Sequence, residues 1–108
     1  MDETVSAFLD FALYYQNDEN GVPLCVTKTK ADLPIELITQ VYAEVLDFCV
    51  RVREVTKRNF QPDQIGVDFY FARNSGATGF WDKPDIYGTY ANQLQEIAES
   101  YSPIYLSL

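Results

Sequence analysis

Residues 65–83 read IGVDFYFARNSGATGFWDK, and this stretch decides the predicted fold. Apolar side chains at every second position, from Ile65 to Phe71, are typical of a strand with one buried face. The small residues of 74–79 predict a turn, and Phe80 begins the return strand. We therefore expect residues 65–83 to form a β-hairpin with a longer loop.

Helical periodicity flanks this hairpin on both sides. Apolar residues spaced by three and four predict helices over residues 3–16, 33–57 and 87–101. Alternation in the last residues, Ile104, Leu106 and Leu108, predicts a final strand. The sequence thus predicts one α+β domain over residues 1–108. In it, a small antiparallel sheet (the hairpin of about 65–83 plus the C-terminal strand) packs against a long central helix and two shorter helices.

The composition of the 108 residues excludes several kinds of site. There is no His, so neither a Ser–His–Asp nor a Cys–His arrangement can form, and no glycine-rich phosphate motif occurs. Two Cys without a CxxC pair favour reduced structural thiols over a metal site. No apolar run is long enough to cross a bilayer. We expect a soluble cytoplasmic protein without enzymatic activity, metal or cofactor.

The net charge of −8 is concentrated in the N-terminal half. Residues 1–50 hold nine acids and two bases, and residues 51–108 hold seven and six, so the halves carry −7 and −1. Four acids share one outward stripe of the long helix, the acidic ridge: Glu36, Glu44, Asp47 and Glu54. This ridge is either a solvated face paired with Arg51 and Arg58, or a mimic of nucleic-acid phosphates that occupies a basic channel on another protein. Direct binding of nucleic acid is not expected at this charge.

The tip of the predicted hairpin is the second candidate surface. Its candidate partner-binding residues are Arg73, Asn74, Trp81 and Asp82. Aromatic and Arg side chains often anchor interfaces, although Trp81 fits equally well in a core. Asp68 and Asp82 flank the hairpin and could act as paired catalytic carboxylates. The alternative is that they are a solvent-facing strand residue and a turn cap.

The same stretch carries a family resemblance. Asp68-Phe-Tyr-Phe-Ala-Arg-Asn74 followed by Gly79-Phe-Trp-Asp82 resembles the signature D-F-x-x-T-R-N-x-H-G-x-G-F-W-D of small phage- and plasmid-encoded proteins of unestablished function. The helices before and after it are similar too, so the likeness spans most of the chain. The sequence departs from the signature at Gly76, where the family has His, and at the two residues that follow. This departure favours a structural or binding role.

The resemblance implies a mobile-element protein that acts in a bacterial host cytoplasm. Small acidic proteins of such elements include anti-CRISPR and anti-restriction proteins, which inhibit host defence by binding nucleoprotein complexes or nucleases. The leading hypothesis is therefore a stoichiometric inhibitor that binds a protein partner. Two alternatives remain: an enzyme or small-molecule binder that uses Asp68, Arg73, Asn74 and Asp82, or a structural module that oligomerises through aromatic surface.

Overall fold

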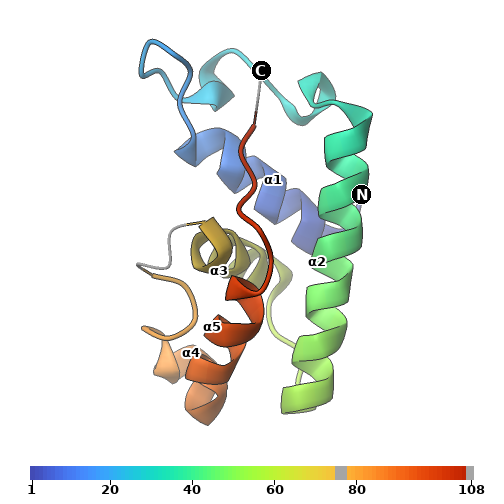
Figure 1. Ribbon diagram of the computed structural model, residues 1–108, viewed down its shortest axis with the longest axis vertical. Helices are drawn as coiled ribbons and strands as arrows, with labels where there is room; N and C mark the ends of the chain where they lie inside the picture. Colours follow the sequence, from blue (N-terminus) through green and yellow to red (C-terminus); the bar gives the residue numbers. More distant parts are fainter. Residues whose placement is uncertain (75–77, 107–108) are drawn as a thin grey trace.

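The computed structural model describes residues 1–74 and 78–106, and these residues form a helical fold (Figure 1). The elements are α1 (Glu3–Tyr15), the 3₁₀ turns η1 (Leu24–Val26) and η2 (Lys30–Asp32), α2 (Ile35–Thr56), α3 (Pro62–Asn74), α4 (Pro84–Tyr87), the 3₁₀ turn η3 (Gly88–Tyr90) and α5 (Ala91–Glu99). Within the described residues, β pairing is limited to an isolated bridge between Asn17 and Pro23. The predicted α+β fold is therefore wrong.

The predicted first hairpin strand is the helix α3. Its buried residues recur at three- and four-residue spacing: Ile65, Gly66, Asp68, Phe69, Tyr70, Ala72 and Arg73. Neighbours pack on several sides of α3, because α1 and α5 contact it and Phe69 stacks on Phe48 of α2 with ring centroids 4.0 Å apart. A helix covered on several sides needs apolar residues around most of its circumference, and along the chain these alternate like those of a strand. The predicted turn residues at positions 75–77, Gly76 among them, lie outside the described residues.

The return strand is also absent. Pro84, which was expected to end it, instead begins α4, where a missing backbone N–H leaves no helical hydrogen bond unmade. The predicted helix over 87–101 corresponds to η3 and α5. The helices predicted over 3–16 and 33–57 are confirmed as α1 and α2. Asp2 caps α1 by accepting hydrogen bonds from the N–H groups of Thr4 and Val5 at 2.8 and 3.2 Å.

The C-terminal segment, residues 102–106, is extended but pairs with no strand. It runs from the end of α5 across α1 (Figure 1). Side-chain amides bond its backbone instead: Asn74 donates to the Ile104 carbonyl at 2.7 Å and accepts from the Ile104 N–H at 3.2 Å. Gln16 donates to the same carbonyl at 2.9 Å and accepts from the Leu106 N–H at 2.8 Å. The predicted final strand thus has an extended backbone without a sheet, and its last two residues lie outside the described part.

The long helix α2 stands on one side, where α1 and α5 pack against it and α3 meets it through Phe69 and Arg73 (Figure 1). The core lies between them, with Phe8 of α1, Phe48 of α2, Phe69 of α3 and Phe80 all fully buried. Each buried aromatic ring removes roughly 150–250 Å² from water, so this cluster stabilises the fold without a disulfide. No described helix is both long and apolar enough to cross a membrane.

Candidate functional site

The acidic ridge of α2 is divided between free and engaged carboxylates. Glu36 and Glu54 are exposed. Glu44 forms an ion pair with Arg73, and Asp47 accepts a hydrogen bond from the hydroxyl of Tyr101. The middle of the ridge is therefore turned towards the rest of the molecule. The expected pairing of Asp47 with Arg51 is replaced by a shared partner, because Arg51 also bonds the Tyr101 hydroxyl at 3.2 Å.

Arg73, predicted at an exposed hairpin tip, has a fully buried side chain. Its guanidinium donates to the Ser102 carbonyl from Nε at 3.0 Å and from Nη2 at 2.6 Å, besides pairing with Glu44. Its central carbon also lies 5.0 Å from the ring centroid of Phe69 and 5.3 Å from that of Tyr101. These contacts join α3 to α2 and to the C-terminal segment. Arg73 is therefore placed as part of the core and is not accessible to a partner.

Asp68 is also buried, with 1% of its surface exposed. Its carboxylate accepts hydrogen bonds from Gln64 Nε2 at 2.7 Å and from the hydroxyl of Tyr87, and it forms an ion pair with Lys83 Nζ at 3.2 Å. Burial, and then the hydrogen bond to Asp68, raise the pKa of Tyr87. Asp68 thus holds the 78–87 region against α3. It does not face solvent, as the predicted strand required.

Trp81 and Asp82 are the exposed members of the predicted hairpin tip. The side chain of Trp81 is 48% exposed. Asp82 accepts from the Thr78 hydroxyl at 2.6 Å and from the Gly79 N–H at 3.0 Å, and the Thr78 hydrogen bond is the main cause of its lowered pKa. This is a turn cap, as the alternative reading of the sequence expected. Asp68, Arg73, Asn74 and Asp82 each bond to the chain itself, so they form no open cluster.

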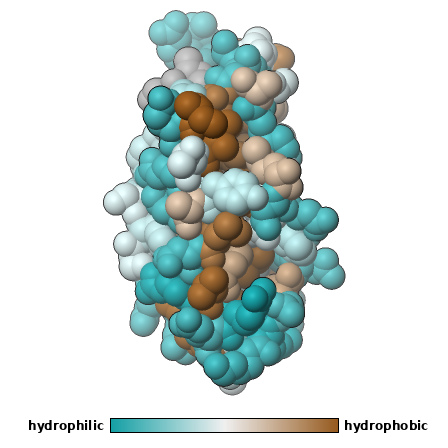
Figure 2. Space-filling view, turned by 90° about the vertical axis from the view of Figure 1, so that its right-hand side faces the viewer, coloured by the Kyte–Doolittle hydropathy of each residue, from teal (hydrophilic) through white to brown (hydrophobic). Residues whose placement is uncertain are grey.

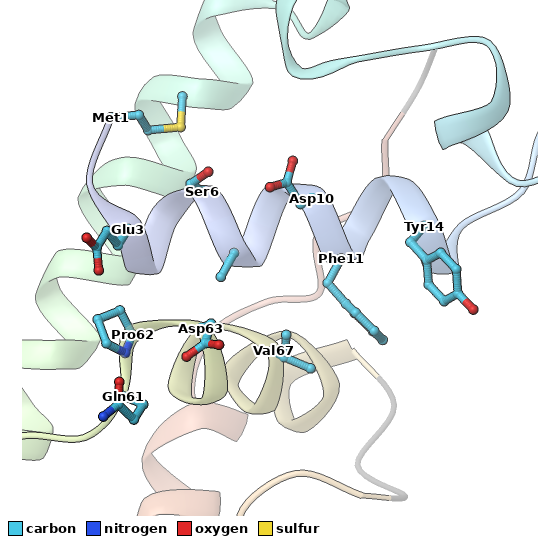
Figure 3. A pocket seen from close by; sticks show the side chains of 11 residues that line it. Met1, Glu3, Ser6, Asp10, Phe11, Tyr14, Gln61, Pro62, Asp63 and Val67 are labelled. Atoms are coloured by element: carbon cyan, nitrogen blue, oxygen red, sulfur yellow. The ribbon is translucent and has the colours of Figure 1, made fainter.

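A shallow groove lies between α1 and α3 (Figure 3). It has a volume of about 760 Å³. Gly66 permits the close helix crossing below it, because a Cβ there would lie 2.7 Å from the Thr4 carbonyl oxygen and 3.0 Å from the Ala7 Cβ. The floor is mainly apolar, with Ala7 and Phe11 from α1 and Val67 from α3. Gly66 thus determines how closely α3 can approach α1.

The walls of this groove are acidic on both sides. Glu3 and Asp10 on α1 and Asp63 in the first turn of α3 all line it (Figure 3). Lys30 pairs with Asp10 at 3.2 Å, whereas Glu3 and Asp63 have no ion pair among the described residues. Two carboxylates without an ion pair in the described part of the chain, Glu3 on α1 and Asp63 on α3, therefore line the groove together with apolar side chains, in a chain whose net charge is −8.

The groove combines carboxylates with apolar surface, a combination that suits side chains with a positive charge at the end of an aliphatic chain. Within residues 1–74 and 78–106, no three His, Cys, Asp or Glu side chains come together as metal ligands would. The acids are instead spread along the groove. Lys and Arg have the matching shape, because their aliphatic stems can lie on apolar surface while their charged ends reach a carboxylate. A basic protein segment therefore fits the groove better than a single ion does.

Sequence reasoning missed this groove. Its signal was the seven-residue spacing of Glu3 and Asp10, which places both on one exposed side of α1. The opposite wall could not be foreseen, because Asp63 was assigned to the loop before a strand. Two of the three acids of the groove, Glu3 and Asp10, belong to the N-terminal half, where most of the negative charge lies.

Comparison of the chain with protein-family models, with curated proteins and with solved structures finds no match. The resemblance of residues 68–82 to phage and plasmid proteins therefore stays a prediction.

Proposed function

We propose that this protein acts by stoichiometric binding to a protein partner, and that the α1–α3 groove receives a basic segment of that partner. The observation that carries the proposal is the combination of acids on both walls with an apolar floor between them. Opposite charges on two proteins accelerate their encounter and fix their orientation. The apolar floor supplies affinity that salt does not screen, since burial of apolar surface is insensitive to ionic strength.

The partner class follows from this chemistry and from the family resemblance. Nucleases and nucleoprotein defence complexes carry basic channels for nucleic acid, and an acidic protein can occupy such a channel. We therefore propose an inhibitor of a bacterial defence system, of the anti-restriction or anti-CRISPR kind, acting in the host cytoplasm. The groove supports this role better than the α2 ridge does, because Glu44 and Asp47 are engaged within the molecule.

The enzymatic alternative receives no support from the geometry. Asp68 and Arg73 are buried and bonded to the chain, and Asp82 caps a turn, so the predicted pair of catalytic carboxylates, Asp68 and Asp82, is not open to a substrate. A general base must reach its substrate within hydrogen-bond distance, directly or through one water.

The test is phage plating on bacteria that carry a restriction or CRISPR system, with and without expression of the protein. An inhibitor is expected to raise the plating efficiency of a sensitive phage. The variant Glu3→Lys/Asp63→Lys reverses both uncompensated charges of the groove and is expected to abolish this rise. Glu96→Lys/Glu99→Lys is the matched control, because it makes the same charge change at two exposed positions of α5.

Capture of the defence complex by tagged protein, repeated over a salt series, separates the interpretations. Retention at low salt, release at high salt and loss in the groove variant alone would support the proposal. If the groove variant and the control behave alike, the groove is not the interface. If the protein protects phage against no such system and retains none of its components, the inhibitor function is wrong.

A further inference from the structure

The outward face of α2 exposes large apolar side chains. Ile35, Leu46 and Val50 are 68%, 39% and 52% exposed, and Tyr42 between them is half-buried. Their spacing places these four residues on one side of the helix, and together they form the α2 stripe. Figure 2 views the side of the molecule on which α2 lies and shows apolar residues in a band along its long axis. Contiguous apolar surface of this kind marks interaction sites in soluble proteins.

A hollow beside the stripe offers a place where a side chain of a partner can insert. It has a volume of about 520 Å³ and lies between the C-terminal half of α2 and the segment that leads into α3. Leu46 and Val50 border it on one side, and Phe60 and Ile65 on the other. An apolar side chain from a second helix laid along the stripe can enter this hollow, which is how buried anchors stabilise interfaces.

The charges along the same face point to one occupant. Glu36 lies near the start of α2, and Arg53 and Lys57 lie at its end, so the two ends carry opposite charge. We propose that the stripe is the interface of a homodimer in which two copies of α2 pack antiparallel. A two-fold axis midway between residues 36 and 53 places Glu36 of each copy opposite Arg53 of the other, so the ion pair forms twice. The same axis places Tyr42 level with residue 47 of the second copy, one residue from its Leu46.

Other arrangements fit the charges less well. A parallel pair would oppose Glu36 to Glu36 and Arg53 to Arg53, and like charges repel. The antiparallel pair contains one unfavourable contact, because Glu54 lies on the same edge of the helix as Glu36 and faces it across the interface. We therefore expect a weak dimer, and we expect Glu54→Lys to tighten it at least threefold.

The test is sedimentation equilibrium of the full chain over a wide range of protein concentration. A reversible monomer–dimer equilibrium is expected. Val50→Glu should raise the dimer dissociation constant at least tenfold, and Val26→Glu is the matched control, because Val26 is 65% exposed on η1, away from the stripe. Helical circular dichroism checks that each variant is folded, and Leu46→Glu serves as a second stripe variant if Val50→Glu unfolds.

Charge exchange identifies the antiparallel geometry. Arg53→Glu alone should weaken the dimer, and the double variant Glu36→Arg/Arg53→Glu should restore it, because the pair re-forms with reversed signs. A monomer at every concentration overturns the proposal, as does a dimer that Val50→Glu leaves unchanged. A dimer weakened by Val50→Glu but not restored by the charge exchange overturns the antiparallel register. None of the four stripe residues lines the groove, so the stripe variants leave its walls unchanged and these outcomes are distinguishable from failure of the proposed inhibitor function.

Discussion

Replacement of Gly66 by Ala tests the close crossing of α1 and α3. Alanine normally stabilises a helix interior by about 1 kcal/mol relative to glycine. Here the added Cβ would lie 2.7 Å from the Thr4 carbonyl oxygen and 3.2 Å from the Phe8 nitrogen, and both are backbone atoms of α1 that a rotamer change cannot move. Overpacking of this kind costs roughly 1–3 kcal/mol, and more where backbone must shift. We expect a net loss of about 1–2 kcal/mol in the free energy of unfolding.

Urea denaturation followed by circular dichroism at 222 nm measures this loss. With a slope typical of a small protein, the midpoint should fall by roughly 1 M urea. Ala43→Gly, at an exposed position of α2, is the control for helix propensity and should cost about 1 kcal/mol. If Gly66→Ala instead stabilises the protein by the amount that Ala43→Gly costs, the two helices do not approach as described and the reasoning is refuted.

Three further predictions concern buried polar groups. Glu44→Ala should cost more than about 2 kcal/mol in urea unfolding, because it leaves Arg73 buried without its counter-charge, whereas Glu36→Ala should change stability by less than about 0.5 kcal/mol. Asn74→Ala removes both hydrogen bonds to Ile104 and should speed amide hydrogen exchange in the C-terminal segment. Unchanged exchange would contradict the view that the Asn74 side chain holds this segment in place. Burial raises the pKa of Cys49 to about 11, so its thiol should stay protonated at pH 8–9. It should therefore react with iodoacetamide far more slowly than the exposed Cys25 does.

The long helix and the first helix could be predicted from the sequence because each buries one face. Val41, Val45, Phe48 and Val52 keep the spacing of a single stripe, and the opposite side of α2 remains polar enough to show the period. Pro34 is the N-cap residue of α2, immediately before Ile35, a place where its missing N–H leaves no helical hydrogen bond unmade.

The α3 region could not be predicted by the same reasoning, because burial on several sides removes the polar face from which the period is inferred. Asp68 and Arg73 made the problem worse: both are charged, and charged residues are assigned to solvent by default. Their charged and hydroxyl partners, Lys83 and Tyr87 for Asp68 and Glu44 for Arg73, explain why they can be buried. Those partners lie 15 to 29 residues away, so no local pattern reports them.

The surroundings of Arg73 have a consequence for how the molecule opens. One guanidinium contacts Glu44 of α2, the carbonyl of Ser102, and the rings of Phe8 and Phe69 in α1 and α3. Detaching α2 or the C-terminal segment strips a charged group of partners while apolar rings still enclose it. Partial opening at either place therefore costs nearly as much as complete unfolding, and we expect the amides of these distant segments to exchange as one cooperative unit. Arg73, together with Gln16 and Asn74, thus ties the end of the chain into the stability of the whole domain.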